Sequence, residues 1–177
     1  VMPISSSSFF RPQLNAENLG KLNVTHFKLT NARILQANLF AIGAFAGSVG
    51  SIESITIQNV YGGNGVDLGS LFLHFACPTL KSLKLDRVSN LSPTSLTLSP
   101  KLEDISLTNL VSSIPSQTFT NENVPNIQNI TIFALDILYS ISTDAFKDLT
   151  SLASVEITAT RITYIQSFSF NNRAVKP

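Results

Sequence analysis

The sequence has little of several features that mark common functional classes. Only 13% of its 177 residues are charged, and 12 basic side chains against 11 acidic ones give a formal net charge of +1. A surface with so few and such evenly balanced charges offers no basic patch for nucleic acid or for an anionic membrane. We therefore expect neither of these partners.

Cysteine and histidine are also scarce. The single cysteine, Cys77, cannot form a disulfide within the chain. His74 lies three residues before it, but the segment LFLHFACP is apolar and supplies no third residue to orient a nucleophile and its base. With His26 as the other histidine, no metal-binding spacing is present. We expect no enzyme, metal or cofactor, and interpret Cys77 as a buried apolar side chain.

Long apolar runs and recognised ligand loops are missing as well. The longest apolar stretch, residues 39–47, is far shorter than the roughly 20 residues that cross a bilayer. The opening residues VMPISSSSFF lack the basic and apolar regions of a secretion signal. The glycine cluster at 61–69 lacks the spacing of phosphate-binding loops and is expected to form a loop on the rim of the fold.

Acidic pairs do not indicate a catalytic site either. Glu103 and Asp104 are adjacent, and Asp144 and Asp148 are four residues apart. Adjacent residues of a strand point to opposite faces, and neither pair lies in a segment that predicts a pocket. We interpret all four as solvated surface carboxylates.

What the sequence does contain is a short repeated pattern of three apolar residues at relative positions 1, 4 and 6. The six copies start 28, 28, 22, 25 and 25 residues apart. They are Val24/Phe27/Leu29, Ile52/Ile55/Ile57, Leu80/Leu83/Leu85, Leu102/Ile105/Leu107, Ile127/Ile130/Ile132 and Leu152/Val155/Ile157. Repeats of about 20 to 29 residues predict a coil in which each turn contributes one strand and a return segment. An apolar content of 44% suffices for one continuous core.

A second series of large apolar residues follows the triplets. One lies five to eight residues before the next triplet, or before the place where one would start: Phe45, Phe75, Leu96, Phe119, Phe146 and Phe170. Stacked rings need no hydrogen-bond partner and fill a large volume. The 12 phenylalanines and the absence of tryptophan fit this structural role.

These turns resemble leucine-rich repeats. The clearest copy spans residues 152–170, LASVEITATRITYIQSFSF, and matches the family pattern LxxLxLxxNxIxxI followed by phenylalanine. Residues 141–152 and 112–119 resemble the arcs of extracellular members. The resemblance implies an α/β solenoid with about six short parallel strands and irregular or short-helical arcs.

The chain departs from the family pattern in two ways. The family's asparagine at position 9 is replaced by Ala32, Val60, Val88, Leu110, Leu135 and Thr160, while Asn31, Asn59 and Asn109 lie one residue earlier. These asparagines either bond the backbone of the bend in a different geometry or face solvent. Cysteine-rich end caps, usual in secreted members, are also absent.

We expect three regions along the chain. Residues 1–20 form an N-terminal cap or the tail of a preceding repeat, in which Asn15 begins a short helix. Residues 21–170 form the solenoid. Residues 171–177 form a C-terminal tail that leaves the last turn unsealed, although repeat proteins normally cover such an end with a polar terminal turn. We expect this end to be covered by further residues of a longer chain, by a partner protein or by a second copy.

The exposed strand residues, which lie on the concave face in the family, are either a candidate binding surface or an ordinary solvated face, since they include few of the aromatic residues that mark strong interfaces. Positions 3, 5 and 8 are mostly polar and carry both signs of charge. The candidate binding residues are His26, Lys28, Lys84, Arg87, Asp104, Thr131, Phe133 and Glu156. Three Asn-x-Ser/Thr sequences make Asn23, Asn90 and Asn129 candidate sites of N-glycosylation.

The sequence therefore predicts a non-catalytic leucine-rich repeat scaffold for protein or glycan recognition, extracellular or secreted. The alternative is a structural protein whose uncapped repeats assemble end to end into a filament or matrix. The expected partners are a protein or a second copy at the open ends of the solenoid.

Overall fold

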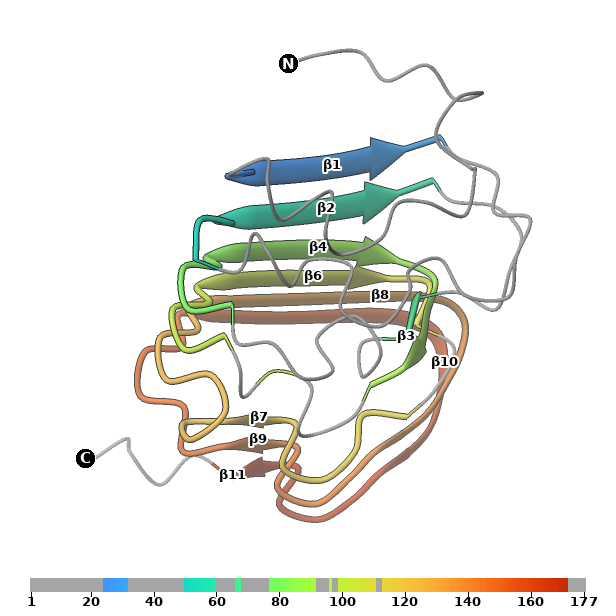
Figure 1. The fold of residues 1–177 in the computed structure, drawn as a ribbon. Helices are drawn as coiled ribbons and strands as arrows, with labels where there is room; N and C mark the ends of the chain where they lie inside the picture. Colours follow the sequence, from blue (N-terminus) through green and yellow to red (C-terminus); the bar gives the residue numbers. More distant parts are fainter. Residues whose placement is uncertain are drawn as a thin grey trace.

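A six-stranded parallel sheet forms the main element of the fold (Figure 1). The structure, a computed structural model, describes residues 24–31, 50–59, 66–67, 77–91, 96, 99–110 and 113–171. The strand order is β1-β2-β4-β6-β8-β10. The bounds are β1 (His26–Thr30), β2 (Ser54–Gln58), β4 (Ser82–Asp86), β6 (Asp104–Thr108), β8 (Asn129–Ile141) and β10 (Ser154–Ile165). Each predicted apolar triplet thus contributes one strand.

Neighbouring strands pair without any offset between repeats. His26 pairs with Ser54, Ser54 with Ser82, and Ser82 with Asp104, so position 3 of each turn faces position 3 of the next. The same register continues from β6 to β8 and from β8 to β10. Equal positions of every turn therefore lie in columns that run across the sheet.

The core consists of the columns at positions 1, 4 and 6. In the four central turns, these side chains are all buried. They are Ile52, Ile55, Ile57, Leu80, Leu83, Leu85, Leu102, Ile105, Leu107, Ile127, Ile130 and Ile132. Phe27 and Leu29 in the first turn, and Leu152, Val155 and Ile157 in the last, are only partly buried. The predicted solenoid with six parallel strands is confirmed.

A sharp corner follows the first four strands at position 8. Asn31, Asn59, Arg87 and Asn109 have φ values of 56°, 52°, 58° and 54°. This left-handed conformation is rare for residues with a side chain, and asparagine adopts it more readily than most. The corner explains why asparagine recurs at position 8 rather than at position 9.

The last two turns pass this corner differently. Ala134 and Ala159 stand at position 8, and β8 and β10 continue through it for 13 and 12 residues in all. A register shift between Ala159 and Arg161 accompanies the bend. Such an irregularity bends a strand without a left-handed residue.

The return segments form two smaller groups of strands. On one side, β3 (Val66–Asp67) pairs with β5 (Val88–Asn90), and Ile114 bridges to Ile141. On the other, β7 (Phe119–Thr120), β9 (Phe146–Lys147) and β11 (Phe170–Asn171) form a parallel sheet in the order β11-β9-β7. Gln117, Asp144 and Phe168, two residues before each of these three strands, also have positive φ.

Three phenylalanines of the predicted series stack on one another. The ring centroids of Phe119 and Phe146 are 5.1 Å apart, and those of Phe146 and Phe170 are 4.8 Å apart. Leu96, the residue predicted to take this place in its turn, is fully buried. The series is confirmed at these positions, whereas Phe45 and Phe75 lie outside the described residues.

The helical arcs implied by the family resemblance are not confirmed, nor is the α/β class. No α-helix occurs within the described ranges, where the arcs consist of short strands and turns. The backbone N–H of Phe119 donates to the carbonyl of Ala145, and that of Phe146 to Ser169. Because the arcs bond to neighbouring turns, their polar groups are satisfied without a helix. The described fold is a parallel β-solenoid.

The predicted N-terminal cap and most of the predicted C-terminal tail lie outside the residues that the structure describes. These ends comprise residues 1–23 and 172–177, and the helix expected at Asn15 lies in the first of them. Among the residues described, no helix is long and apolar enough to cross a membrane.

Candidate functional site

The outward side of the main sheet carries the candidate binding residues. We call this surface the sheet face; it consists of the residues at positions 3, 5 and 7, which alternate with the buried positions 4 and 6. Of the eight candidates, seven lie on it: His26, Lys28, Lys84, Asp104, Thr131, Phe133 and Glu156. Arg87 lies at the corner that follows β4. Their role in binding stays a prediction.

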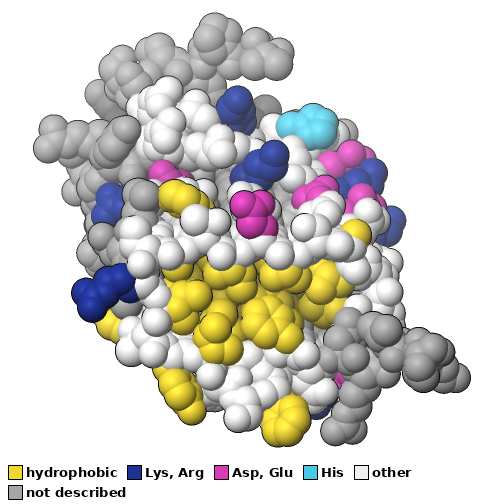
Figure 2. Space-filling view, turned by 180° about the vertical axis from the view of Figure 1, so that it is seen from behind, with side chains coloured by type: hydrophobic (Ala, Val, Ile, Leu, Met, Phe, Trp, Pro, Cys, Tyr) yellow, Lys and Arg dark blue, Asp and Glu magenta, His cyan; other side chains and the backbone are white. Residues whose placement is uncertain are grey.

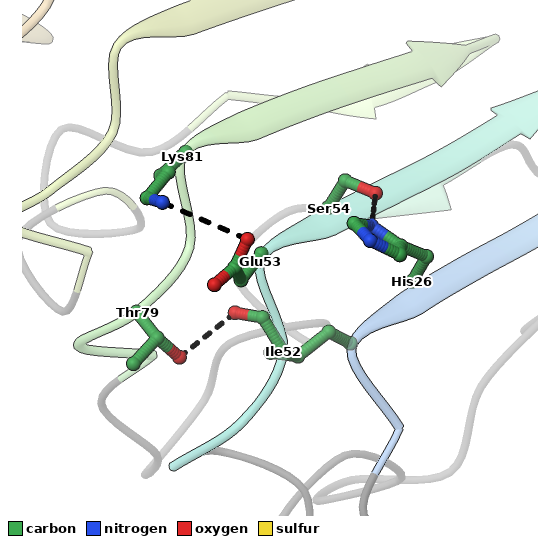
Figure 3. A network of polar contacts seen from close by, with 6 residues as sticks. All are labelled: His26, Ile52, Glu53, Ser54, Thr79 and Lys81. Carbon is green, nitrogen blue, oxygen red and sulfur yellow. Dashed lines mark hydrogen bonds and ion pairs between the residues drawn. The ribbon is translucent and has the colours of Figure 1, made fainter.

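Polar side chains in column 3 bond to their neighbours along the solenoid. Nδ1 of His26 lies 2.8 Å from Oγ of Ser54 (Figure 3). Farther along, Nδ2 of Asn129 donates to Oδ1 of Asp104 at 2.7 Å. These contacts link side chains of neighbouring turns on the sheet face.

The edge of the sheet where the strands begin is tied by side-chain contacts between turns. Nζ of Lys81 lies 3.6 Å from Oε2 of Glu53, and the hydroxyl of Thr79 donates to the carbonyl of Ile52 at 2.9 Å (Figure 3). The two charged side chains are about half exposed. An ion pair this accessible to solvent adds little stability, typically below about 1 kcal/mol.

A polar cluster lies at the corner after the strands. The carboxylate of Asp86, with 7% of its surface exposed, accepts hydrogen bonds from the Asn59 backbone N–H at 3.0 Å and from Asn109 Nδ2. Asn59 Nδ2 in turn donates to Asn31 Oδ1 at 3.2 Å. The side-chain amides of Asn59 and Asn109 therefore donate to side-chain oxygens of neighbouring turns, while the backbone N–H groups of Asn31 and Asn109 donate to carbonyls of the following turn. Neither sequence interpretation anticipated Asp86 as their shared acceptor.

Column 7 was missing from the sequence prediction except for one member. It runs Thr30, Gln58, Asp86, Thr108, Phe133 and Thr158. The period of two within a strand was the available signal, because position 7 follows positions 3 and 5 on the same side. Asp86 differs from the rest of the column in charge, and Phe133 differs in being aromatic.

Phe133 is the exposed aromatic side chain of this face. It lies on β8 with 39% of its surface exposed, and it pairs with Thr108 on one side and Thr158 on the other. The backbone carbonyl of Phe133 accepts from the N–H of Asn109 at 2.6 Å, which fixes the strand at this point. An apolar ring thus stands between two small polar side chains on a firmly bonded strand.

The solvent-accessible charges of the sheet face and of the corner at position 8 are segregated along the solenoid, whereas the acidic Asp86, in the same turn as Lys84, is nearly buried. The basic side chains of columns 5 and 8 come from the early turns, at Lys28, Lys84 and Arg87. Among the later turns, Asp104 in column 3 and Glu156 in column 5 are acidic. A partner with the opposite arrangement of charges would be oriented along the axis.

A scan of protein-family models matches residues 44–176 to the BspA type leucine-rich repeat region, in six copies. The chain belongs to this family. No curated protein and no solved structure matches it. Leucine-rich repeats are stacked scaffolds that expose extended surfaces for binding, and this BspA-type chain shares that architecture.

Two of the residues that the sequence analysis considered for catalysis, Cys77 and Asp144, are respectively buried and bonded to neighbouring side chains in this BspA-type domain. Burial raises the pKa of the Cys77 thiol to about 11, so the thiolate is strongly disfavoured at neutral pH, and His74 lies outside the described residues. Asp144 lies 3.3 Å from Nζ of Lys147 and accepts from Nδ2 of Asn171 at 2.9 Å. Within the described ranges, no three His, Cys, Asp or Glu side chains gather as metal ligands.

The three candidate glycosylation sites lie in different parts of the chain. Asn129 is exposed on the sheet face at the start of β8, the strand next to the edge strand β10, and its amide nitrogen is bonded to Asp104. Asn90 ends β5 and is described by its backbone alone, and Asn23 precedes the described residues. Glycosylation stays a prediction at all three.

Proposed function

We propose that this BspA-type domain is a non-catalytic scaffold that recognises a protein partner through its sheet face. The observation that carries the proposal is the exposed ring of Phe133 between Thr108 and Thr158. Protein interfaces are enriched in aromatic residues, and binding energy concentrates where such a side chain enters a pocket of the partner. Phe133 is the anchor of the proposed interface.

Polar neighbours supply the orientation of this interface. Thr131 and Glu156 pair directly across β8 and β10, and Asp104 and Asn129 are bonded to each other at position 3, four positions before that of Phe133. The basic residues Lys28 and Lys84 lie in earlier turns. A partner that places basic groups near Glu156 and acidic groups near Lys84 matches this distribution.

Selection from a random-peptide display library against the full chain tests the anchor. Peptides that bind the wild type are expected to lose at least about tenfold in affinity for Phe133→Ala, the scale of a 1.4 kcal/mol contribution. The matched control is Glu122→Ala, an exposed residue on the return arc. Peptides indifferent to Phe133, or equally weakened by both substitutions, contradict the sheet-face proposal.

A glycan is the alternative ligand that we propose for the sheet face. The hydroxyl and amide side chains around Phe133 can bond sugar hydroxyls, and an exposed ring can pack on a sugar. A glycan array probed with the wild type and with Phe133→Ala separates the two ligand classes. Glycans bound through Phe133 without any selected peptide would replace protein by carbohydrate as the proposed ligand.

We propose that the domain works outside the cell. Support comes from the resemblance of its arcs to extracellular repeats and from the Asn-x-Thr sequence at the exposed Asn129. Intact-mass measurement of native material before and after deglycosylation tests this. A mass shift abolished by Asn129→Gln would support secretion and contradict sheet-face binding, because a glycan there would lie on the face itself, on the strand that carries Phe133.

The last turn favours a second function, in which copies of the chain join end to end. Inner side chains of that turn are exposed at Ile162, Ile165 and Phe170. Light scattering at rising protein concentration tests this function: growth beyond a monomer supports it, and a monomer throughout contradicts it.

A further inference from the structure

The last turn of the solenoid exposes side chains that other turns bury. Ile162, Ile165 and Phe170 are 39%, 50% and 51% exposed, whereas the residues paired with them in the preceding turn, Leu138, Ile141 and Phe146, are 0%, 1% and 3% exposed. We call the surface they form the end face. It also includes the partly buried Leu152, Val155, Ile157 and Ala159.

The end face is continuous. Most of its members follow one another along β10, and Figure 2 shows apolar side chains gathered in one area of the surface. Charged side chains of the same turn, Glu156 and Arg161, lie on outward positions of β10 and are exposed. Natural sheet edges are often protected by a charge that points inward, and the end face has none among its described members.

The backbone of β10 restricts the direction of any strand that pairs with it. β10 lies at the edge of the six-stranded sheet, and all five strand pairs of that sheet are parallel and join equal repeat positions. The surface complementary to β10 is therefore a parallel strand with large apolar residues at positions 4 and 6. The other edge of the sheet is such a strand: β1 carries Phe27 and Leu29 at these positions, both only partly buried.

We propose that the end face binds the first strand of a second copy, so that β10 of one copy pairs in parallel with β1 of the next. This inference rests on the second function proposed above and specifies its contact. In the register used throughout the sheet, position 5 places Glu156 beside the second copy's Lys28. Opposite charges at directly neighbouring sheet positions favour the pairing, whereas like charges oppose it.

Two further columns fit the same register. At position 3, Ser154 lies beside the second copy's His26, which within its own chain already bonds to a serine at the same position, Ser54. At the corner, the N–H of Asn109 donates to the carbonyl at position 7 of the following turn, Phe133. In this register, the N–H of Ala159, at the same position 8 but in a strand that continues through the corner, would lie opposite the carbonyl of the second copy's Thr30.

The contact is head to tail and therefore open-ended. A heterologous contact that does not close into a ring produces chains of increasing length. Two end faces meeting each other would instead stop at a dimer and would leave Lys28 without a role. The number of copies and the role of Lys28 thus distinguish the two arrangements.

Charge exchange tests the pairing in the full chain. Light scattering of the wild type is expected to show growth with concentration. The single variants Glu156→Lys and Lys28→Glu, which replace an attraction by a repulsion, are each expected to need a roughly two- to tenfold higher concentration for the same growth. The double variant Lys28→Glu/Glu156→Lys restores the opposite pair and is expected to assemble as the wild type does.

A matched exchange controls for net charge. Lys101 and Glu122 are exposed residues away from both edges of the sheet, so Lys101→Glu/Glu122→Lys is expected to leave assembly unchanged. A wild type that stays monomeric overturns the inference and the second function together. Assembly that ignores every charge variant, or that ends at a dimer, overturns the inference but leaves self-association standing.

Disulfide trapping gives an independent measurement of the register. Adjacent strands lie about 4.8 Å apart, within the Cα separation that a disulfide spans. The variant His26→Cys/Ser154→Cys is expected to form a ladder of linked copies on oxidation, while the native Cys77 is buried and adds little background. Cross-linked dimers from Ser154→Cys alone would show that end faces meet each other, and no cross-linking would contradict the register.

Discussion

The rings of Phe146 and Phe170 stack nearly parallel, with centroids 4.8 Å apart and an interplanar angle of 3°, although their environments differ greatly. Phe146 is 3% exposed and has a second ring, that of Phe119, on its other side. Phe170 is half exposed because it belongs to the last described turn. In this ring stack, Phe146 is therefore buried and Phe170 faces solvent.

Removing the middle ring is expected to be much costlier than removing the outer one. Phe146→Ala leaves a cavity between two rings and should lower the free energy of unfolding by about 3 to 5 kcal/mol. Phe170→Ala removes a half-exposed ring and should cost about half as much or less. Urea denaturation measures both. Phe168→Ala, at a 74% exposed position, serves as the control, and equal losses at Phe146 and Phe170 would contradict the stack.

Equal repeat positions should respond according to their place in the solenoid. Leu80 and Leu152 both occupy position 1, but Leu80 is fully buried and Leu152 only partly. We expect Leu80→Ala to cost about 2 to 5 kcal/mol and Leu152→Ala clearly less. Urea denaturation midpoints of the two variants measure these losses for the same substitution at the same repeat position. A larger loss at Leu152 would indicate that its turn is covered in solution.

The corner residue Asn109 separates backbone strain from hydrogen bonding. Its φ of 54° disfavours alanine, and its side chain donates to the nearly buried Asp86. Asn109→Ala should therefore cost about 1 to 3 kcal/mol from strain and the lost hydrogen bond together. Asn109→Gly loses only the hydrogen bond, because glycine adopts positive φ readily, and should cost less. The order is checked by thermal unfolding, and the reverse order would refute the left-handed corner.

The buried thiol should be unreactive in the native protein. Cys77 is 1% exposed and burial raises its pKa to about 11, so it lacks both access and thiolate character. Labelling with a disulfide reagent near pH 8 should be slow in buffer and rapid in denaturant. Fast stoichiometric labelling of the folded chain would exclude the described burial.

The same pKa predicts a loss of stability in base. The raised pKa means that the folded chain keeps the thiol proton between about pH 9 and pH 11, while the unfolded chain, with the ordinary value of 9.0, releases it. The unfolded state then binds fewer protons, so stability falls as pH rises through this window. The wild type should lose more stability than Cys77→Ala between pH 8 and pH 11. Parallel losses in both would assign the effect to other groups.

Most of the sheet could be predicted from the sequence because each turn repeats the same apolar spacing. Burial at positions 1, 4 and 6 gives every strand and its register, since an offset would expose Ile55 or Leu83. The arcs are less regular in sequence, and the resemblance supplied helices that the described arcs lack. There, hydrogen bonds between turns decide the conformation, and these depend on neighbours more than 20 residues away.

The candidate site was predictable in part for a similar reason. Alternation along each strand places Lys28, Lys84 and Glu156 outward. The role of Asp86 was not accessible, because its donors come from two other turns and meet only at the left-handed corner. Backbone conformation, rather than composition, brings that cluster together.

Pairing without offset has a consequence for how such a chain tolerates change in length. Deleting a few residues within a strand shifts every later side chain out of its column. Deleting or duplicating an entire winding, 22 to 28 residues here, recreates the same neighbours at the new junction. Variation in size among relatives is therefore expected in whole windings.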